Sequence, residues 1–221
     1  MPVDRISRRG AVSTGFPLEQ AEMVARGIVE ALRPHAERIE IAGSIRRRRP
    51  QVHDIDLVAI PRMTSIGSMF APRDVRDTDF AHFFLRVLSG EDVVGEKILR
   101  GEVSLNVAGL PPRIQVDCYI ATAETWATLL LIRTGSAEHN IRLCQLAGRL
   151  GGKLHADGSG LELPGEYNAV LQRQETNVFY PQSEEEIFAR LGIAYLPPEL
   201  REQGVTWQLT KSATEPQGRS A

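Results

Sequence analysis

Residues 43–57 combine two kinds of side chain that could act on phosphates. The stretch begins with Gly43 and Ser44, continues through the arginine run Arg46–Arg49, and ends in two aspartates. A backbone turn, a hydroxyl and guanidinium forks all donate hydrogen bonds to phosphate oxygens. The first part of the stretch therefore predicts a binding site for phosphate groups.

Asp54 and Asp56 stand two residues apart at the start of the apolar segment 54–60, which we predict to be a strand. Side chains alternate between the faces of a strand, so both carboxylates should point the same way. Carboxylates this close repel each other unless a cation lies between them, and Mg²⁺ prefers oxygen ligands of this kind. A predicted phosphate-binding site beside a pair of carboxylates predicts metal-assisted phosphoryl chemistry.

A third carboxylate, Asp117, lies in the middle of a second predicted strand, residues 113–120. Gln115 and Tyr119 share its face, and the other face is apolar. A carboxylate inside a strand is disfavoured by propensity, so we expect a compensating partner, and a shared metal would provide one. The apolar face comprises Ile114, Val116, Cys118 and Ile120.

Composition limits the classes of protein that the chain can represent. Its 221 residues are 42% hydrophobic and 24% charged, which is typical of a globular protein with a substantial core. The formal net charge of −2 provides no global attraction for a polyanion, so nucleic-acid contacts must come from local patches such as Arg46–Arg49. Cys118 and Cys144 lack metal-ligand spacing and indicate reduced thiols. No segment resembles a membrane span or signal peptide, so we expect a cytoplasmic protein without membrane contact.

The rest of the chain predicts helices and strands in an α+β arrangement. A helix should begin at Pro17 and end before Pro34, and Ser136 and Ser183 should cap two later helices. We expect residues 62–76 to form a loop or an insertion. Further helices are predicted at 80–88, 122–132, 137–150 and 184–191, and further strands at 38–42, 102–108, 153–156, 161–163 and 177–180.

Changes in composition divide the chain into four expected parts. A polar leader occupies residues 1–16 and a polar tail occupies residues 204–221. Between them we expect a catalytic domain at 17–133 and a smaller α+β domain at 134–203.

Taken together, these motifs resemble the family X DNA polymerases, the polymerase-beta-like branch of the nucleotidyltransferases. The resemblance covers about residues 17–202. The Gly-Ser and Asp-x-Asp motifs alone indicate only a nucleotidyltransferase, whereas the Thr-Gly-Ser turn and the closing segment narrow the resemblance to family X. The residues that carry it are Gly43-Ser44-x-Arg46-Arg47, Asp54-x-Asp56, Asp117, Thr134-Gly135-Ser136, Glu138–Leu143, Glu184–Ile187 and Leu196–Arg201.

The resemblance implies a nucleotidyltransferase palm with a mixed sheet, followed by a small α+β thumb. It implies a DNA polymerase that adds dNMP to a primer 3′-hydroxyl by two-metal phosphoryl transfer with release of pyrophosphate, in short-gap repair synthesis. The expected partners are primer–template or gapped DNA and a nucleoside triphosphate, and the expected oligomeric state is a monomer.

The resemblance also implies roles for particular residues. Asp54, Asp56 and Asp117 would hold two Mg²⁺ ions, or Mn²⁺, with Asp117 nearest the primer hydroxyl. Arg46 would serve a structural ion pair. Residues expected to bind the nucleotide are Gly43, Ser44, Arg47, His53, Thr134, Gly135, Ser136 and Asn140, and residues expected to contact nucleic acid are Arg48, Arg49, Arg133 and Arg142.

Within the nucleotide set, Ser44 and Arg47 would bind the β- and γ-phosphates. Asn140 would touch the base from the minor-groove side. Gly135-Ser136 would form a turn with a cis peptide beside the sugar.

Three features depart from the family pattern. His53 stands where glycine is usual, next to the phosphate-binding turn. Ile132-Arg133 replaces an aromatic pair that lies near the sugar 2′ position, which bears on the choice between dNTP and NTP. Neither a helix–hairpin–helix lyase domain before residue 17 nor a phosphoesterase domain afterwards is expected, so only palm and thumb are predicted.

Other interpretations of the same residues remain. An isolated Asp-x-Asp is more often a solvated turn than a metal site, and an isolated arginine run is more often a solvated face. A nucleotidyltransferase could also act on an RNA end, by template-independent terminal transfer, or on a protein or small molecule. A non-catalytic nucleic-acid-binding module is disfavoured because all three carboxylates are present.

Overall fold

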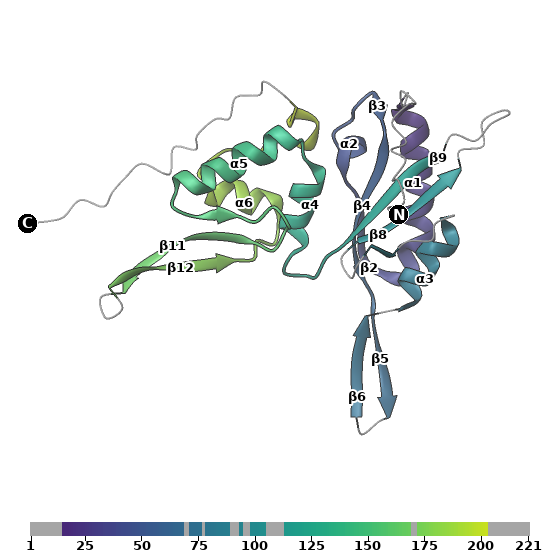
Figure 1. Ribbon diagram of the computed structural model, residues 1–221, viewed down its shortest axis with the longest axis horizontal. Coiled ribbons are helices and arrows are strands. Elements are labelled where there is room, and N and C mark those ends of the chain that lie inside the picture. The colour runs from purple at the N-terminus through teal and green to yellow at the C-terminus, as the bar shows by residue number, and fades with distance from the viewer. Residues whose placement is uncertain are drawn as a thin grey trace, which may run out of the picture.

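The computed structural model describes residues 15–68, 71–76, 78–88, 93–94, 98–104, 113–168 and 172–202. These residues form two lobes, one built on a twisted sheet and the other on helices and a long hairpin (Figure 1). The predicted α+β fold with a mixed sheet is confirmed. The predicted tail lies outside the described residues, as does the predicted leader except for its last two residues.

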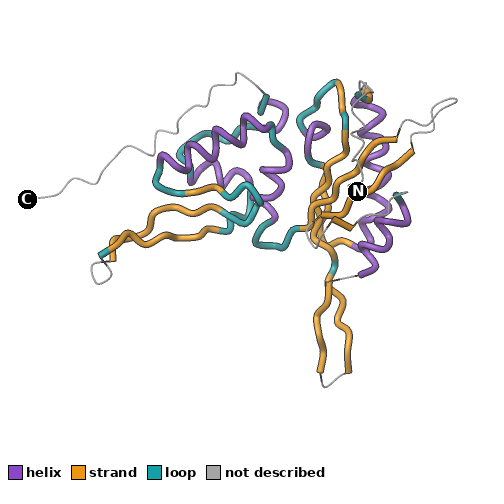
Figure 2. Tube along the Cα trace, in the orientation of Figure 1, coloured by secondary structure: helices purple, strands orange, loops and turns teal. Residues whose placement is uncertain are grey.

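The first lobe is organised by a five-stranded sheet with the order β2-β4-β9-β8-β7. The central pair, β4 and β9, is parallel, whereas the other neighbours are antiparallel. Figure 2 shows these strands together in orange. Their bounds are β2 Ala36–Ile41, β4 Asp54–Pro61, β7 Val93–Val94, β8 Ile98–Ser104 and β9 Arg113–Ile120.

Two helices cover one face of this sheet, α1 (Leu18–Leu32) and α3 (Thr78–Val87). The helix α1 follows Pro17 as predicted, and a short 3₁₀ turn, Arg33–His35, ends it at the proline. The apolar residues of α1 recur with helical period and pack on those of α3 and the strands. The core between these helices and the sheet includes Ala25, Ile28, Leu57, Phe80, Phe84 and Val116.

Residues 62–76, predicted as a loop or an insertion, do not form a loop. This segment forms a hairpin of β5 (Met63–Ser68) and β6 (Ala71–Arg76), which extends away from the first lobe (Figure 1). Its Ser, Thr and Gly-rich sequence lacks the apolar alternation that identifies a strand packed on a core. Antiparallel backbone pairing from Met63–Arg76 to Ser68–Ala71 forms this hairpin.

The strand predicted at residues 102–108 was misplaced. The observed β8 runs from Ile98 to Ser104, and residues 105–108 lie outside the described part of the chain. Glycine in this segment concealed the start of the strand, because Gly101 suggested a turn. In the structure Gly101 lies against α3, where an added Cβ would come within 2.7 Å of the Leu88 Cβ.

The second lobe contains three helices, α4 (Trp126–Thr134), α5 (Ala137–Arg149) and α6 (Glu184–Arg190). They pack over an antiparallel sheet with the order β10-β11-β12. Ser136 caps α5 and Ser183 caps α6, as predicted, because each hydroxyl accepts a hydrogen bond from a backbone N–H of the first turn. The strands are β10 Lys153–Leu154, β11 Leu161–Asn168 and β12 Arg173–Phe179.

Three details of this lobe differ from prediction. The helix predicted at 122–132 begins at Trp126, after a turn in which the Thr122 N–H donates to the Thr125 hydroxyl, and it ends at Thr134. The strands β11 and β12 extend well beyond the predicted 161–163 and 177–180, because their outer parts are polar and exposed and so lack an apolar pattern. Leu150, the last residue of the helix predicted at 137–150, lies outside α5 and is 44% exposed, because α5 ends at Arg149 and the chain then turns at Gly151.

A second hydrophobic cluster joins the two lobes. It contains residues of α4 such as Leu131, thumb-side residues such as Phe188, and the sheet residues Val58 and Tyr119. Val58 and Tyr119 lie on the sheet face opposite to α1 and α3, the face that also carries the predicted carboxylates. That face is therefore partly covered by α4.

The remaining short elements lie at the joints of the fold. The strands β1 (Phe16–Pro17) and β3 (Gln51–Val52) pair with each other, α2 (Gly43–Arg46) links β2 to β3, and a 3₁₀ turn spans Pro198–Leu200. Within the described residues, no helix has the length and apolar composition that crossing a membrane requires.

Candidate active site

The turn that leads into α2 packs directly on a predicted metal ligand. Gly43 has a φ of 58°, and a Cβ at this position would lie 2.0 Å from the Asp56 Oδ2. The adjacent Ala42 N–H donates to the Asp56 carbonyl at 2.8 Å, so the turn and β4 are held together. Only glycine satisfies both the left-handed conformation and this close approach.

Ser44, the next residue, presents a hydroxyl that the folded chain does not satisfy. Its Oγ is buried and has no hydrogen-bond partner among the described residues. A buried polar atom without a partner costs free energy that a bound ligand could recover. This atom therefore fits the predicted contact with a phosphate oxygen.

Asp54 and Asp56 lie on the same face of β4, at partly buried positions. Among the described residues, neither carboxylate has a side-chain hydrogen bond or an ion pair. Burial, followed by the charges of Asp54 and Asp117, raises the pKa of Asp56 to about 7, although the nearby Arg133 and Arg47 oppose the shift. The site therefore concentrates negative charge that its own residues leave largely uncompensated.

Asp117 is the direct neighbour of Asp56 in the parallel register of β4 and β9. Unlike the Asp56 carboxylate, the Asp117 carboxylate accepts hydrogen bonds at both oxygens. Arg100 donates from Nε to Oδ1 at 2.7 Å and from Nη2 to Oδ2 at 2.8 Å, and the Gln115 amide lies 3.1 Å from both oxygens. Sequence reasoning missed Arg100 because the predicted strand began two residues after it.

The predicted metal ligands have the oxygen atoms that a divalent cation prefers, but their side chains are not arranged around a common point. Among the described residues, no group of three or more His, Cys, Asp or Glu side chains has an arrangement that could hold a metal. Asp54 and Asp56 supply unpaired oxygens of the kind that Mg²⁺ prefers, and their mutual repulsion is what a cation would relieve. The oxygens of Asp117, in contrast, are directed to Arg100.

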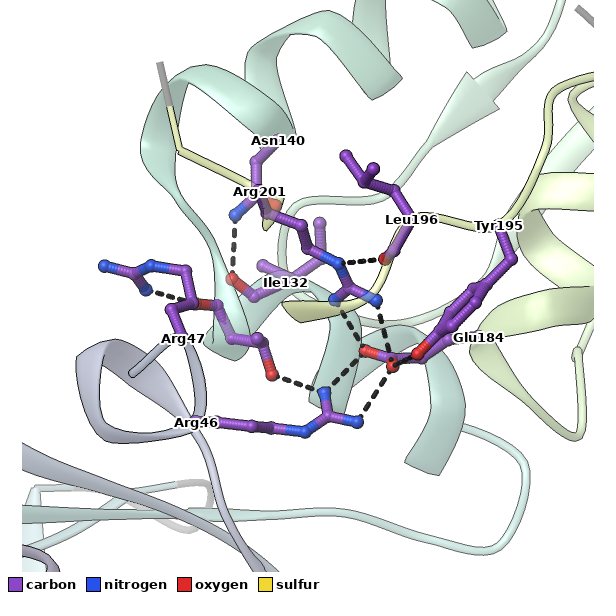
Figure 3. Close-up of polar contacts among 9 residues, drawn as sticks. Arg46, Arg47, Ile132, Asn140, Glu184, Tyr195, Leu196 and Arg201 are labelled. Carbon is purple, nitrogen blue, oxygen red and sulfur yellow. Dashed lines mark hydrogen bonds and ion pairs between the residues drawn. The ribbon is translucent and has the colours of Figure 1, made fainter. Parts of the chain in front are cut away.

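Arg46 forms the structural ion pair that was predicted for it. Its guanidinium donates to both Glu184 oxygens, at 2.8 and 2.9 Å, and to the Thr134 hydroxyl at 2.7 Å. Arg201 approaches the same carboxylate from the other side at 3.0 and 3.1 Å (Figure 3). Burial favours a higher pKa for Glu184, but hydrogen bonds from the two arginines outweigh it and lower the pKa.

Arg47 lies between the two lobes. Its Nη1 donates to the Thr134 carbonyl, and its Nε donates to Glu202 at 2.8 Å. Arg49 lies 3.3 Å from the other Glu202 oxygen. The contact with Glu202 joins residues 155 positions apart in the chain, and sequence reasoning did not anticipate it.

The turn Thr134-Gly135-Ser136 contains the cis peptide that was predicted for Gly135–Ser136. Ser136 Oγ donates to the Arg201 carbonyl at 2.7 Å and accepts from the His139 N–H at 3.3 Å. Arg46 and Arg47 both donate to Thr134, so the phosphate-side turn and this turn are tied together.

Asn140 and Arg133 extend the site toward α4 and α5. The Asn140 Nδ2 donates to the Ile132 carbonyl at 2.7 Å, whereas its Oδ1 is buried without a partner among the described residues (Figure 3). The Arg133 guanidinium stacks 4.0 Å from the centre of the Tyr119 ring. Arg133 therefore brings a cation to the carboxylates from the second lobe.

Most predicted site residues gather at one place, where α2, the ends of β4 and β9 and the 134–136 turn meet. Four others lie at the surface. His53 is exposed next to the start of β4, Arg48 pairs with Glu22 of α1, and Arg49 and Arg142 are exposed. The structure therefore brings together the residues expected to bind metal and nucleotide, and places four outlying residues on its surface.

Comparisons with known proteins match both lobes. Residues 129–202 match the family model of the DNA polymerase beta thumb. The chain is 29% identical over 191 residues to the DNA polymerase/3′-5′ exonuclease PolX of Bacillus subtilis (strain 168), a match that covers 86% of this chain and 29% of that protein. The chain thus spans less than a third of that relative.

The fold also matches a solved structure. The crystal structure of Leishmania infantum polymerase beta, a ternary P/T complex, aligns with a TM-score of 0.64 and 22% sequence identity. The match covers 86% of this chain and 78% of the other. The expected palm-and-thumb architecture is confirmed at the level of the fold.

Proposed function

We propose that the chain is a polymerase-beta-like family X DNA polymerase, which adds a deoxynucleoside monophosphate to a primer 3′-hydroxyl and releases pyrophosphate. The observation that carries this proposal is the packing of the Gly43–Ser44 turn on the Asp56 carboxylate. This contact holds the turn that carries the Ser44 hydroxyl against an acidic residue of the site, as nucleotidyl transfer requires.

In this proposal Asp54, Asp56 and Asp117 hold the divalent cations, Mg²⁺ or Mn²⁺. Bound there, two such ions would activate the attacking hydroxyl and neutralise charge on the transferred and leaving phosphates. The raised pKa of Asp56 supports the assignment, because a group of interacting carboxylates gains most from a cation.

The chain's own residues would orient the nucleoside triphosphate. Ser44 would donate its unpartnered hydroxyl to a phosphate oxygen, and Arg47 would add a charged donor from the same turn. The 134–136 turn and Asn140 would contact the sugar and base. Arg46 has a separate task, because its ion pair with Glu184 holds the palm to the thumb.

We propose that the palm comprises residues 17–133 and the thumb residues 134–203. By this boundary most of α4 belongs to the palm in sequence, although the helix packs with α6 in the second lobe. DNA, as primer–template or gapped duplex, is the proposed partner, and the name of the PolX relative supports this substrate class. Arg48, Arg49, Arg133 and Arg142 would supply cations for the DNA backbone. Short-gap repair is the proposed setting.

We propose a monomer located in the cytoplasm. Both cysteines, Cys118 and Cys144, are free thiols in the structure, which suits a reducing compartment.

Incorporation of dNTP into a one-nucleotide gapped duplex with Mg²⁺ or Mn²⁺ tests the function. The wild type should extend the primer, and Asp54→Asn or Asp117→Asn should lose activity on the order of a thousandfold while remaining folded. Glu102→Gln is the matched control, because this exposed carboxylate lies on the neighbouring strand β8 and contacts only Arg113 among the described residues. Full activity in both aspartate variants would contradict the two-metal assignment.

The same assay separates the alternative acceptors. Reactions with blunt DNA, RNA primers and NTP should be much slower than gap filling with dNTP. Equal use of all acceptors would instead indicate a nucleotidyltransferase without a template.

A further inference from the structure

Arg100 donates hydrogen bonds to both oxygens of Asp117, the carboxylate that the proposed reaction assigns to a metal. We propose that Arg100 is a positioning residue that holds Asp117 in the metal-free protein and competes with the divalent cation for it. Arg100 would thereby set the cation affinity of the site. This inference rests on the proposed function, which makes Asp117 a metal ligand.

The geometry of the pair accounts for the competition. Arg100 forms a two-pronged contact in which each carboxylate oxygen of Asp117 accepts one short hydrogen bond, at 2.7 and 2.8 Å. The Gln115 amide adds a further donor 3.1 Å from each oxygen. A carboxylate oxygen has two acceptor positions, so a cation must share or displace these donors.

Strand register makes the contact specific. Arg100 of β8 is the direct cross-strand partner of Asp117 on β9. Directly opposed residues on one face have side chains within contact distance. The register of β8 and β9 therefore places the two side chains within reach of each other.

The two partners differ in exposure, and this difference distinguishes a competitor from a fixed core ion pair. The Asp117 side chain is 6% exposed, whereas the Arg100 side chain is 44% exposed. Arg100 can therefore leave Asp117 for water without opening the core. The pair Arg46–Glu184 behaves differently, because its carboxylate also holds the fully buried Arg201.

The charge of Arg100 predicts the sign of the effect. In the metal-free protein it offsets the repulsion between Asp117 and Asp56. When a cation arrives, the same positive charge repels it. Removing the charge should therefore lower the stability of the metal-free protein and raise its affinity for the cation, a combination that a purely structural ion pair would not produce.

The same two strands provide a matched control. Arg113 of β9 pairs with Glu102 of β8 at 3.4 Å, with side chains 60% and 50% exposed. Arg113→Gln removes the same charge from the same pair of strands without touching Asp117.

The test uses the full chain and the metal salts alone, without nucleotide or DNA. Thermal unfolding of the wild type, Arg100→Gln and Arg113→Gln is followed as MnCl₂ or MgCl₂ is added. Without cation, Arg100→Gln should unfold at the lowest temperature. Its half-saturating Mn²⁺ concentration should fall about tenfold relative to the wild type, whereas that of Arg113→Gln should change less than about twofold.

Two further variants connect the effect to Asp117. Arg100→Lys keeps the positive charge but loses the two parallel N–H donors of the guanidinium. The Mn²⁺ affinity of this variant should therefore lie between those of the wild type and Arg100→Gln. Adding Asp117→Asn to Arg100→Gln should abolish the gain in affinity. An unchanged or weaker Mn²⁺ affinity in Arg100→Gln, or a gain that survives Asp117→Asn, would overturn the proposal.

The readout also separates this inference from the proposed function. Tighter Mn²⁺ binding by Arg100→Gln without gap filling by the wild type would support the inference and contradict the polymerase proposal. Gap filling by the wild type with no change in Mn²⁺ affinity in Arg100→Gln would support the polymerase proposal and contradict the inference. If no protein in the series responds to Mn²⁺, the inference fails.

Discussion

Two clusters of carboxylates and arginines lie at the joint between the lobes, and they have opposite electrostatic character. At Glu184, one buried carboxylate is held by Arg46 and Arg201, and its pKa is lowered. At Asp56, the negative charges of Asp54 and Asp117 add to burial, and the pKa rises to about 7. The first cluster is satisfied within the protein; the second requires a further positive charge.

This contrast separates a structural ion pair from the proposed ligand-binding site. The Glu184 cluster joins α2 to α6 and to the end of the described chain, so it fixes the position of the thumb. The Asp56 cluster keeps unpaired oxygens against Gly43, and the next residue, Ser44, has a buried hydroxyl without a partner among the described residues. The first cluster stabilises the fold, and the second leaves negative charge available for the proposed ligand.

The largest expected effect comes from breaking the satisfied cluster. Glu184→Gln should destabilise the protein by about 3–5 kcal/mol, because it leaves the buried Arg201 and the partly buried Arg46 without a countercharge. Urea unfolding measures this change. Glu185→Gln, at the exposed neighbouring position, should have almost no effect, and equal losses in the two variants would contradict the structural role of Glu184.

The unsatisfied cluster should respond to pH in the opposite sense to an ordinary salt bridge. The folded pKa of Asp56, about 7, lies above the ordinary aspartate pKa of 3.8, so the folded state binds more protons between these values. Stability without divalent cation should therefore fall by up to a few kcal/mol as pH rises from about 4 to 7.

Asp56→Asn provides the measurement of that pH effect. Unfolding free energies of the wild type and this variant should converge near pH 4 and separate toward pH 8, with the variant more stable. Saturating Mn²⁺ should reduce the difference. A gap that stays constant with pH would show that folding does not raise the pKa of Asp56.

A smaller effect is expected from the hydroxyl beside the carboxylates. Ser44→Ala should weaken binding of a nucleoside triphosphate about tenfold, because one hydrogen bond to a charged phosphate is lost. Stability should not decrease, since the Ser44 Oγ has no partner among the described residues. Calorimetric titration with a nonhydrolysable dNTP gives the affinity, and an unchanged value would exclude Ser44 from the phosphate site.

The smallest effect should come from Glu202, the carboxylate that pairs with Arg47 and Arg49. Glu202→Gln removes a negative charge near the expected phosphates, so triphosphate affinity should rise a few-fold at low salt and less at high salt. Glu199→Gln, a nearby carboxylate outside this pair, is the control. Weaker binding in Glu202→Gln would mean that Glu202 orients Arg47 rather than competing with phosphate.

The carboxylate-bearing strands could be predicted because their signals are local. Alternation in residues 113–120 located β9 to the residue, and the Asp-x-Asp spacing placed Asp54 and Asp56 on one face of β4. The hairpin of β5 and β6 could not be predicted in the same way. Its strands pair through the backbone, and their sequence carries no apolar period.

The partners of the carboxylates were harder to predict than the carboxylates themselves. The chain has 26 lysines and arginines, and nothing in their order indicates which one faces Asp117 or Glu184. Arg100 was missed because its strand was predicted to begin too late, and Glu202 because it is 155 residues from Arg47.

The sequence by itself determined the chemistry available to this protein. Residue type and spacing specify the turn glycine, the hydroxyl and the three acidic side chains, since these depend on backbone conformation within a few residues. Only the tertiary structure decided which charges neutralise one another. Ion pairs form between side chains brought together by strand register and by the packing of one lobe on the other, and those contacts satisfy Glu184 while leaving Asp56 unpaired.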